Sequence, residues 1–174
     1  MFLRMWRFTT IILTALLMGM TFCHVLELSA KMNYDGSLYV TVQNSLYQQF
    51  GGPGIGAFMT LGAILTTAVL SFLVRKRRQV FYLTLTATVC LLLAFPVVFY
   101  LFTEPANIVF RNSTPESLPT DWMRLREQWE YSHAASFVLH LLAFSALVFS
   151  VLIEIPVNRS RIDSLKDCPR DRIA

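Results

Sequence analysis

The sequence predicts an all-α integral membrane four-helix bundle with a short outer amphipathic helix and an extended fourth helix. The first observation behind this prediction is composition: 55% of the 174 residues are hydrophobic and the mean hydropathy is positive. Such a chain is too apolar for a small domain that folds in water. The second observation is a set of four long uncharged runs, and the third is the placement of the basic residues around them.

Each uncharged run approaches the roughly 20 residues that a helix needs to cross a hydrocarbon core of about 30 Å. The predicted spans cover about residues 8–28, 54–74, 80–102 and 134–155. We expect residues 1–158 to form a single membrane domain and residues 159–174 to form a basic cytoplasmic tail.

The first span has an alternative interpretation, because Arg4 and Arg7 ahead of an apolar run also describe a secretory signal peptide. The run is longer than the apolar core of such peptides. The small-residue sequence Leu28-Ser29-Ala30, where cleavage is conceivable, comes only after Glu27. We therefore expect the span to be retained.

The basic residues predict the orientation of the spans. Eleven of the 15 lie before the first span, after the fourth, or in the turn Arg75-Lys76-Arg77-Arg78 between the second and third. The positive-inside rule then places both termini and this turn in the cytoplasm. The excess of basic residues is thus explained by the membrane topology and does not indicate a nucleic-acid site. We expect the lipid bilayer to be the partner of this protein. Anionic lipid is a further candidate for the basic turn.

The first outer segment predicts a short helix lying in the membrane interface. Asp35-Gly36 is a turn signal, and Leu38, Val42, Leu46 and Phe50 then recur every four residues. A strand is the alternative, because residues 39–42 favour it locally. The helix is expected to act as a lid on the bundle or as a gate over a pocket.

The second outer segment leads into the fourth span without a break. Pro115 and Pro119 predict an irregular start, and Thr120 or Asp121 is positioned to cap a helix. From there, residues spaced by three or four form one stripe along that helix: Trp122, Leu125, Trp129, His133, Ser136 and His140. The two histidines share this face about 10 Å apart, too far apart to hold one metal ion together.

Several of these side chains have ordinary interpretations. Trp122, Trp129 and Tyr131 are typical of the aromatic belt at a membrane interface. Arg126 and Glu130 have the spacing of an ion pair along a helix. A histidine within an apolar span is costly to bury, however, so it should face the bundle interior and find a polar partner.

Applying the predicted orientation brings the ionisable side chains of three spans to one level. The first and third spans end at the outer side, where the fourth begins. We therefore expect an outward-facing vestibule formed by His24, Glu27, Glu104, Asn107, Arg126, Glu130, His133 and His140.

These residues also carry a family resemblance. The segments Asp121-Trp122, Leu125-Arg126 and Trp129-Glu130, followed by His133 and preceded by Pro105-x-Asn107, resemble a family of small four-span membrane proteins that includes anthrone oxygenases. The similarity extends over His24-Val25-Leu26-Glu27, Lys31, Asp35-Gly36 and the helix up to Phe50, so it covers nearly the whole chain. Most members of this family are bacterial proteins without an assigned function.

The resemblance implies a four-helix fold and, in the named enzymes, oxygenation of a reduced polycyclic phenol to a quinone. It implies Asn107, Trp129 and His133 as functional residues. One departure is Ser136, where many members carry an arginine three residues after the histidine. The motif is specific for the fold and carries little information about the substrate.

Three functions remain open on the sequence alone. The first is an oxidoreductase for a lipophilic aromatic or quinone-like molecule, in which His133 is the base, Asn107 or Arg126 stabilises a phenolate and Trp129 stacks. Substrate- or cofactor-binding candidates are His24, Glu27, Glu104, Trp122, Glu130 and His140.

The second function is a haem or metal protein that uses His24 with His133 or His140 and in which Glu104 orients a ligand. No closely spaced ligand motif supports a particular metal. The third function is a non-catalytic accessory or envelope protein whose histidines only join helices. The sequence therefore leaves the cofactor open: the protein needs none, or it uses haem or a quinone.

Overall fold

The computed structural model describes residues 1–50 and 54–155. Within these ranges every regular element is helical, and η marks a π-helix. The elements in chain order are α1 (Phe2–Lys31), α2 (Gly36–Val42), η1 (Gln43–Tyr47), α3 (Gln48–Phe50), α4 (Ile55–Leu73), α5 (Arg78–Leu92), η2 (Leu93–Thr103), α6 (Glu104–Arg111) and α7 (Trp122–Leu152). This confirms the predicted all-α bundle. The predicted tail, residues 159–174, lies outside the described residues.

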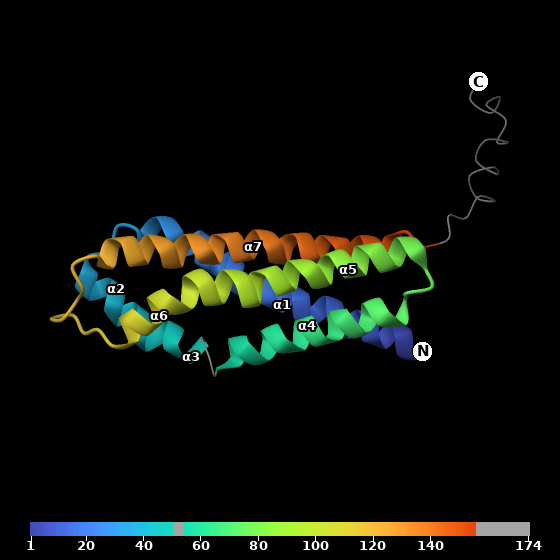
Figure 1. Cartoon of the computed structure of the whole chain (residues 1–174), viewed down its shortest axis with the longest axis horizontal. Helices are drawn as coiled ribbons and strands as arrows, with labels where there is room; N and C mark the ends of the chain where they lie inside the picture. Colours follow the sequence, from blue (N-terminus) through green and yellow to red (C-terminus); the bar gives the residue numbers. More distant parts are fainter. Residues whose placement is uncertain (51–53, 156–174) are drawn as a thin grey trace, which may run out of the picture.

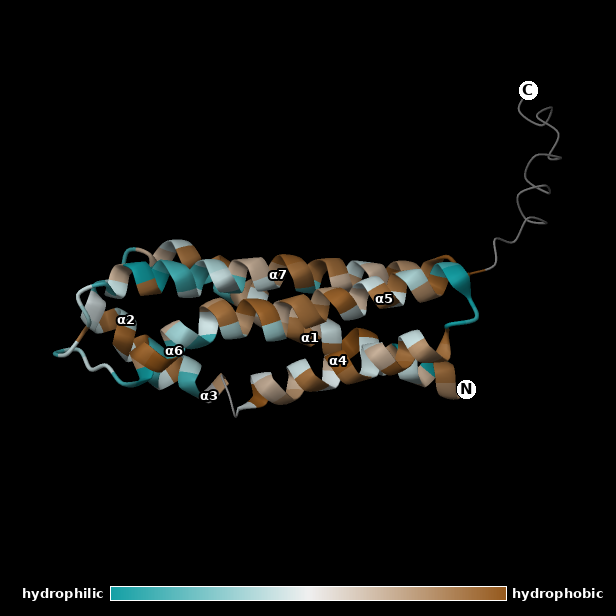
Figure 2. Cartoon of the chain, viewed as in Figure 1, coloured by the Kyte–Doolittle hydropathy of each residue, from teal (hydrophilic) through white to brown (hydrophobic). Residues whose placement is uncertain are grey.

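Four helical segments are long and apolar enough to cross a membrane: α1, α4, the continuous run α5–η2–α6 and α7. Large apolar side chains point away from the bundle, as Phe58 (73% exposed) and Leu65 (64%) do. Figure 2 shows the hydrophobic residues spread over the outside of the middle of the bundle and the hydrophilic ones at its ends. Exposed apolar surface on this scale is stable in lipid and unstable in water. The chain is therefore an integral membrane protein.

The four long segments run up and down in sequence order (Figure 1). The N-terminus, the α4–α5 turn and the end of α7 lie together at one end, which we call the terminal end. The segments α2, η1, α3 and α6 and the start of α7 lie at the opposite end, which we call the distal end.

The interior has two apolar clusters. The first holds the four segments together through mostly small and aliphatic side chains: Leu17, Ala63, Leu70, Val74, Val80, Ala87, Cys90, Leu91, Ala143, Ala146 and Leu147. Alanine at such contacts lets helix backbones approach closely within a membrane. The second cluster lies at the distal end and contains Tyr39, Val40, Ala106, Phe110, Leu125 and Trp129.

The terminal end is fastened by one carboxylate. Glu154 pairs with Arg7 from α1, and its second oxygen lies 2.7 Å from Arg77 in the α4–α5 turn. The hydrogen bond from Arg7 is the main reason that the pKa of the Glu154 carboxyl is lowered. Three segments that are distant in sequence thus meet at one side chain.

The distal end is covered by α2, η1 and α3, which confirms the predicted helix over the predicted strand. Asp35 caps α2 by accepting a hydrogen bond from the Leu38 amide at 2.8 Å, so this turn signal is a helix start. Leu38 and Leu46, both 46% exposed, point away from the bundle, whereas Tyr39 and Gln43 are buried. The apolar row is therefore the outer face of the cover.

Residues 112–121 are irregular, as the two prolines predict, and α7 then begins at Trp122. Asp121 is the residue at the helix start, but its side chain makes no capping hydrogen bond and instead pairs with Arg124 at 2.6 Å. The helix then continues for 31 residues without interruption. His133 and His140 thus belong to a single helix, as predicted.

Candidate functional site

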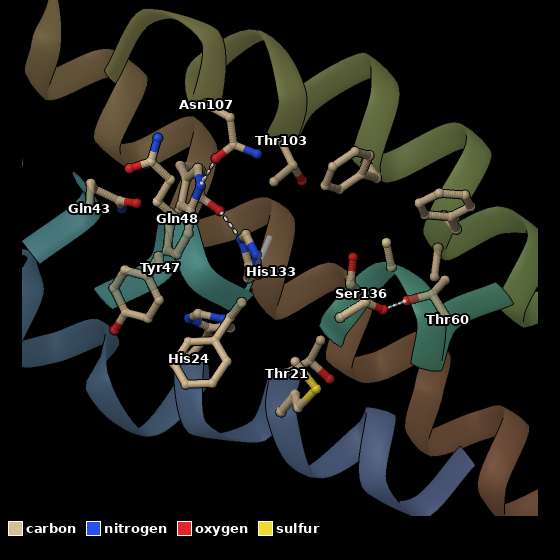
Figure 3. Close-up of a pocket in the computed structure, with 18 of the residues that line it drawn as sticks. Thr21, His24, Gln43, Tyr47, Gln48, Thr60, Thr103, Asn107, His133 and Ser136 are labelled. Atoms are coloured by element: carbon tan, nitrogen blue, oxygen red, sulfur yellow. Dashed lines mark hydrogen bonds between the residues drawn. The ribbon is translucent and has the colours of Figure 1, made fainter. Parts of the chain in front are cut away.

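A cavity of about 160 Å³ lies in the distal half of the bundle, between the two apolar clusters. Figure 3 shows side chains from α1, η1, η2, α6 and α7 pointing into it. Its polar lining residues are Thr21, His24, Gln43, Asn44, Tyr47, Gln48, Thr60, Thr103, Asn107, Arg111, His133, Ser136 and His140. Apolar side chains, among them Met20, Phe95 and Phe99, line the remainder. The cavity thus combines polar groups with an apolar wall at membrane depth.

Both π-helical segments of the described chain line this cavity. The segment η1 contributes Gln43 and Tyr47, and η2 contributes Phe95, Phe99 and Thr103. Pro96 lies inside η2, where its missing amide hydrogen disturbs the regular α-helical ladder. Segments of π-helix are rare and occur frequently at functional sites. Their position is consistent with a functional cavity.

His133 presents an acceptor nitrogen to its surroundings. Its Nδ1 lies 2.9 Å from the Trp129 carbonyl oxygen. Because a carbonyl oxygen only accepts, Nδ1 carries the hydrogen and donates it, and the neutral ring keeps a lone pair on Nε2. The ring lies 3.9 Å from the Trp129 ring and 4.3 Å from the His24 ring, centroid to centroid. The backbone bond thus selects the tautomer suited to a base.

His24 lies at the centre of an aromatic group. Its ring centroid is 5.0 Å from those of Tyr47 and Trp129, and the contact with Trp129 is edge to face. Its Nδ1 is buried and has no hydrogen-bond partner among the described residues. A buried, unpaired ring nitrogen is costly, so it marks a position where a bound molecule could supply the missing bond.

A chain of hydrogen bonds fixes the Trp129 ring. Its indole nitrogen donates to Asn107 Oδ1 at 2.7 Å, and Asn107 Nδ2 donates to Glu104 at 3.0 Å. Glu104 is itself paired with Arg111 at 2.6 Å. Asn107 therefore orients the tryptophan through both ends of its amide.

His140 occupies the deeper end of the cavity. It is 4% exposed, and its Nδ1 lies 3.1 Å from the Thr21 hydroxyl on α1. A histidine within the fourth span is expected to face the bundle interior and to find a polar partner. The His140–Thr21 contact confirms that prediction.

A buried charged network lies behind the aromatic wall. Lys31, 2% exposed, pairs with Glu130 at 2.9 Å and with Glu27 at 3.5 Å. Its ammonium also lies over the Tyr47 and Trp129 rings, at 4.8 and 4.7 Å from their centroids. The same two rings separate this charge from the cavity.

The predicted ion pair between Arg126 and Glu130 is wrong. Lys31 reaches Glu130 from α1, and Tyr39 donates a hydrogen bond to the other carboxylate oxygen at 3.1 Å. Arg126 instead donates to the Tyr34 carbonyl oxygen at 2.9 Å. Contacts between helices therefore outweigh the spacing along one helix.

Two tyrosines of the cover act as hydrogen-bond donors to these carboxylates. The Tyr47 hydroxyl donates to Glu27, and the Tyr39 hydroxyl donates to Glu130. Burial, reinforced by the neighbouring carboxylate, raises the pKa of each tyrosine well above its usual range. Both phenols therefore stay protonated near neutral pH and fasten the cover to α1 and α7.

The structure brings together half of the ten sequence-predicted site residues at the cavity. Those lining it are His24, Asn107, Trp129, His133 and His140. Glu27, Glu104 and Glu130 contact the lining residues or lie in the network behind them. Arg126 and Trp122 do not line the cavity and pack on each other 4.8 Å apart. Trp129 is 2% exposed, so its interpretation as part of an aromatic belt is wrong.

Sequence reasoning missed Lys31, Tyr39, Tyr47 and Thr21. The sequence of α1 carries a signal for Thr21 and Lys31, because polar residues recur along this helix at intervals of three, four or seven. These are Thr10, Thr14, Thr21, His24 and Lys31, of which all but His24 are buried. A polar stripe inside an apolar span predicts the interior face of that span.

His24 and His133 are not placed as the two axial ligands of one haem iron. Two histidines that bind one haem iron lie on opposite faces of the porphyrin, whereas the His24 and His133 rings lie 4.3 Å apart and tilted against each other. His140 is hydrogen-bonded to Thr21. Across residues 1–50 and 54–155, no group of three or more His, Cys, Asp or Glu side chains is placed to hold a metal ion.

Comparison with known proteins adds no relative. No family model matches the chain, and no curated protein or solved structure matches it. A proposal for its function therefore rests on the chemistry of the cavity and on the resemblance carried by the sequence motifs.

Proposed function

We propose that the chain is a membrane-embedded oxidoreductase that oxygenates a lipophilic phenol-like aromatic molecule to a quinone within the distal cavity. The observation that carries this proposal is the tautomer of His133. Its Nδ1–H is committed to the Trp129 carbonyl oxygen, so Nε2 remains a proton acceptor beside the Trp129 and His24 rings. The sequence resemblance to anthrone oxygenases supports the same class of reaction.

The lining residues divide the work between binding and proton transfer. A planar substrate is expected to stack on the aromatic wall, which Asn107 holds in position through the Trp129 indole. His133 then takes a proton from the substrate, because a phenol gives up an electron to oxygen much more readily as its anion. The unpaired His24 Nδ1 is placed to hydrogen-bond a substrate oxygen.

The proposed reaction balances without a further oxidant or reductant. A ring methylene of the reduced substrate loses both hydrogens and becomes a carbonyl. Dioxygen accepts four electrons, one of its atoms becomes the carbonyl oxygen, and the other leaves as water with the two hydrogens. The proton taken by His133 is returned to the departing oxygen, so the histidine ends each cycle neutral.

The proposal predicts oxygen uptake by the purified protein in lipid nanodiscs supplied with an anthrone. Uptake should exceed the spontaneous rate and should match quinone formation one to one, measured by an oxygen electrode and by quinone absorbance. Heat-denatured protein in the same nanodiscs is the control. Uptake equal to that of the control would reject the oxygenase proposal. Quenching of tryptophan fluorescence without uptake would favour a non-catalytic binding protein.

We also propose that both termini face the cytoplasm of a bacterial inner membrane, so that the distal end faces outward. The positive-inside rule supports this orientation, because eleven of the 15 basic residues belong to the termini and the α4–α5 turn.

Thiol labelling of intact cells tests this orientation. In a background lacking the native cysteines, cysteine at Ser45 or Ser117 should react with an impermeant reagent added outside, and cysteine at Gln79 should not. All three positions are exposed, so accessibility to solvent does not distinguish them. The reverse labelling pattern would overturn the orientation.

A further inference from the structure

We infer that the cavity exchanges its ligand sideways with the bilayer, through a slit between the first turns of α4 and the segment η2. This inference rests on the proposed function for the identity of the ligand. The route itself follows from the packing of the helices and applies to any lipophilic molecule of suitable size.

The two walls of the slit belong to segments that do not pack closely together. Gly56, Ala57 and Thr60 line the cavity from α4, and Phe95 and Phe99 line it from η2. The helix α4 packs on α1 and α5, and η2 packs on α7, α6 and α5, but α4 and η2 are not a closely packed pair. The bundle is thus closed on three sides of the cavity.

The burial pattern of α4 agrees with this opening. The buried residues of the helix are Ala63, Thr67, Leu70 and Ser71, and none of them lies in its first two turns. At the start of the helix, a Cβ on Gly56 would lie 2.4 Å from the Phe50 carbonyl oxygen. The beginning of α4 is therefore packed against the end of the cover.

Over the distal cluster, access from the distal end is blocked by the cover. Tyr39 and Phe110 are 0% and 1% exposed and lie together in the distal cluster. Asn44 donates hydrogen bonds to the carbonyl oxygens of Phe110 and Ser113, at 2.9 and 3.0 Å, and so joins η1 to α6 and the loop after it.

Access from the terminal end is blocked by the apolar core. Below the His140–Thr21 contact the helices meet through Leu17 and Ala143, which are 4% and 0% exposed. A molecule that reaches His133 must therefore pass through the side of the bundle.

The rim of the slit has the polarity of the lipid layer beside it. Among the lining residues, those classed as exposed are Gln48, Phe50 and Arg111, all at the distal edge. Phe95 and Phe99 lie deeper along the same opening. The order of Gln48 and Arg111 at the distal edge and Phe95 and Phe99 deeper in the bundle suits an amphiphile that enters with its polar end toward the distal side.

A cysteine reporter inside the cavity tests the route without requiring catalysis. Ser136 lines the cavity and is 8% exposed, so Ser136→Cys, in a chain lacking the native cysteines, reports access. N-phenylmaleimide, which partitions into the bilayer, should label this cysteine in nanodiscs, and a sulfonated maleimide in the water should not. Ala57→Trp, which places a large ring in the slit, should slow the labelling by about tenfold or more.

Ala68→Trp is the matched control, because Ala68 is an exposed alanine of the same helix that does not line the cavity. It should leave the labelling rate unchanged. If Ala57→Trp does not give a monodisperse helical protein, Thr60→Phe replaces it with the same expected result. Labelling by the water-soluble reagent, equal rates in the slit and control variants, or no labelling by either reagent would each overturn the inference. Absence of oxygen uptake by the wild type would reject the oxygenase proposal and leave the labelling result unaffected.

Discussion

His133→Ala is expected to abolish turnover of an anthrone-like phenol and to leave the bundle folded. A positioned general base contributes about 10² to 10⁴-fold to a rate, so kcat should fall by a factor in that range. Folding should persist because, among the described residues, this ring makes one hydrogen bond, which goes to its own helix, and because removing the ring enlarges an existing cavity. Oxygen uptake and a thermal unfolding curve in the same nanodiscs measure both effects.

His140→Gln is the control for this experiment. His140 lines the same cavity but bonds to Thr21, and glutamine retains a hydrogen-bonding group at that depth. Turnover should therefore stay within a few-fold of the wild type. An unchanged rate in His133→Ala, or an equal loss in both variants, would remove His133 from the proposed role of base.

Glu130→Ala is expected to lower the free energy of unfolding by about 3–5 kcal/mol. Removing one partner of a buried ion pair leaves the other charge uncompensated, and Lys31 is only 2% exposed. The other carboxylate partner of Lys31 is Glu27, whose oxygen lies 3.5 Å from the Lys31 ammonium, against 2.9 Å for Glu130. Tyr39 also loses its acceptor. Denaturant unfolding in mixed micelles, followed by tryptophan fluorescence, measures the change.

Two further variants separate this effect from the loss of any carboxylate on α7. Glu127→Ala removes an exposed carboxylate one turn earlier and should change stability by less than about 0.5 kcal/mol. The double variant Lys31→Met with Glu130→Leu replaces the pair by apolar groups and should recover most of the lost stability. If Glu130→Ala is no less stable than Glu127→Ala, the buried pair does not hold the distal end together.

The sequence predicts the helices of this protein better than it predicts their faces. Runs of about 20 apolar residues locate the four membrane segments because lipid requires each span to satisfy its own backbone hydrogen bonds. In lipid, however, apolar side chains occur on both the interior and the exterior face of a helix, so hydropathy does not tell the two faces apart. Leu38 and Leu46 formed the apolar row that predicted the cover helix, yet they point outward, because an apolar side chain exposed to lipid carries no penalty.

The sequence predicts those site residues whose polar side chains are too costly to expose to lipid. His133 and His140 are costly to expose to lipid, and both line the cavity. The ion pair between Arg126 and Glu130 could not be judged from spacing, because the competing partner, Lys31, lies 99 residues from Glu130 along the chain and meets it only in the fold. For the π-helical geometry of η2, the one sequence feature that gave an indication is Pro96.

The meeting of Arg7, Arg77 and Glu154 has a consequence for the order in which the protein is made. Arg7 leaves the ribosome before Arg77, and the carboxylate that joins them follows only after the fourth helix is complete. Until then the early helices can insert and move apart without this ionic contact between them. The last part of the described chain to be translated is therefore also the part that fastens the first, so that the finished bundle is locked only when every helix is in the membrane.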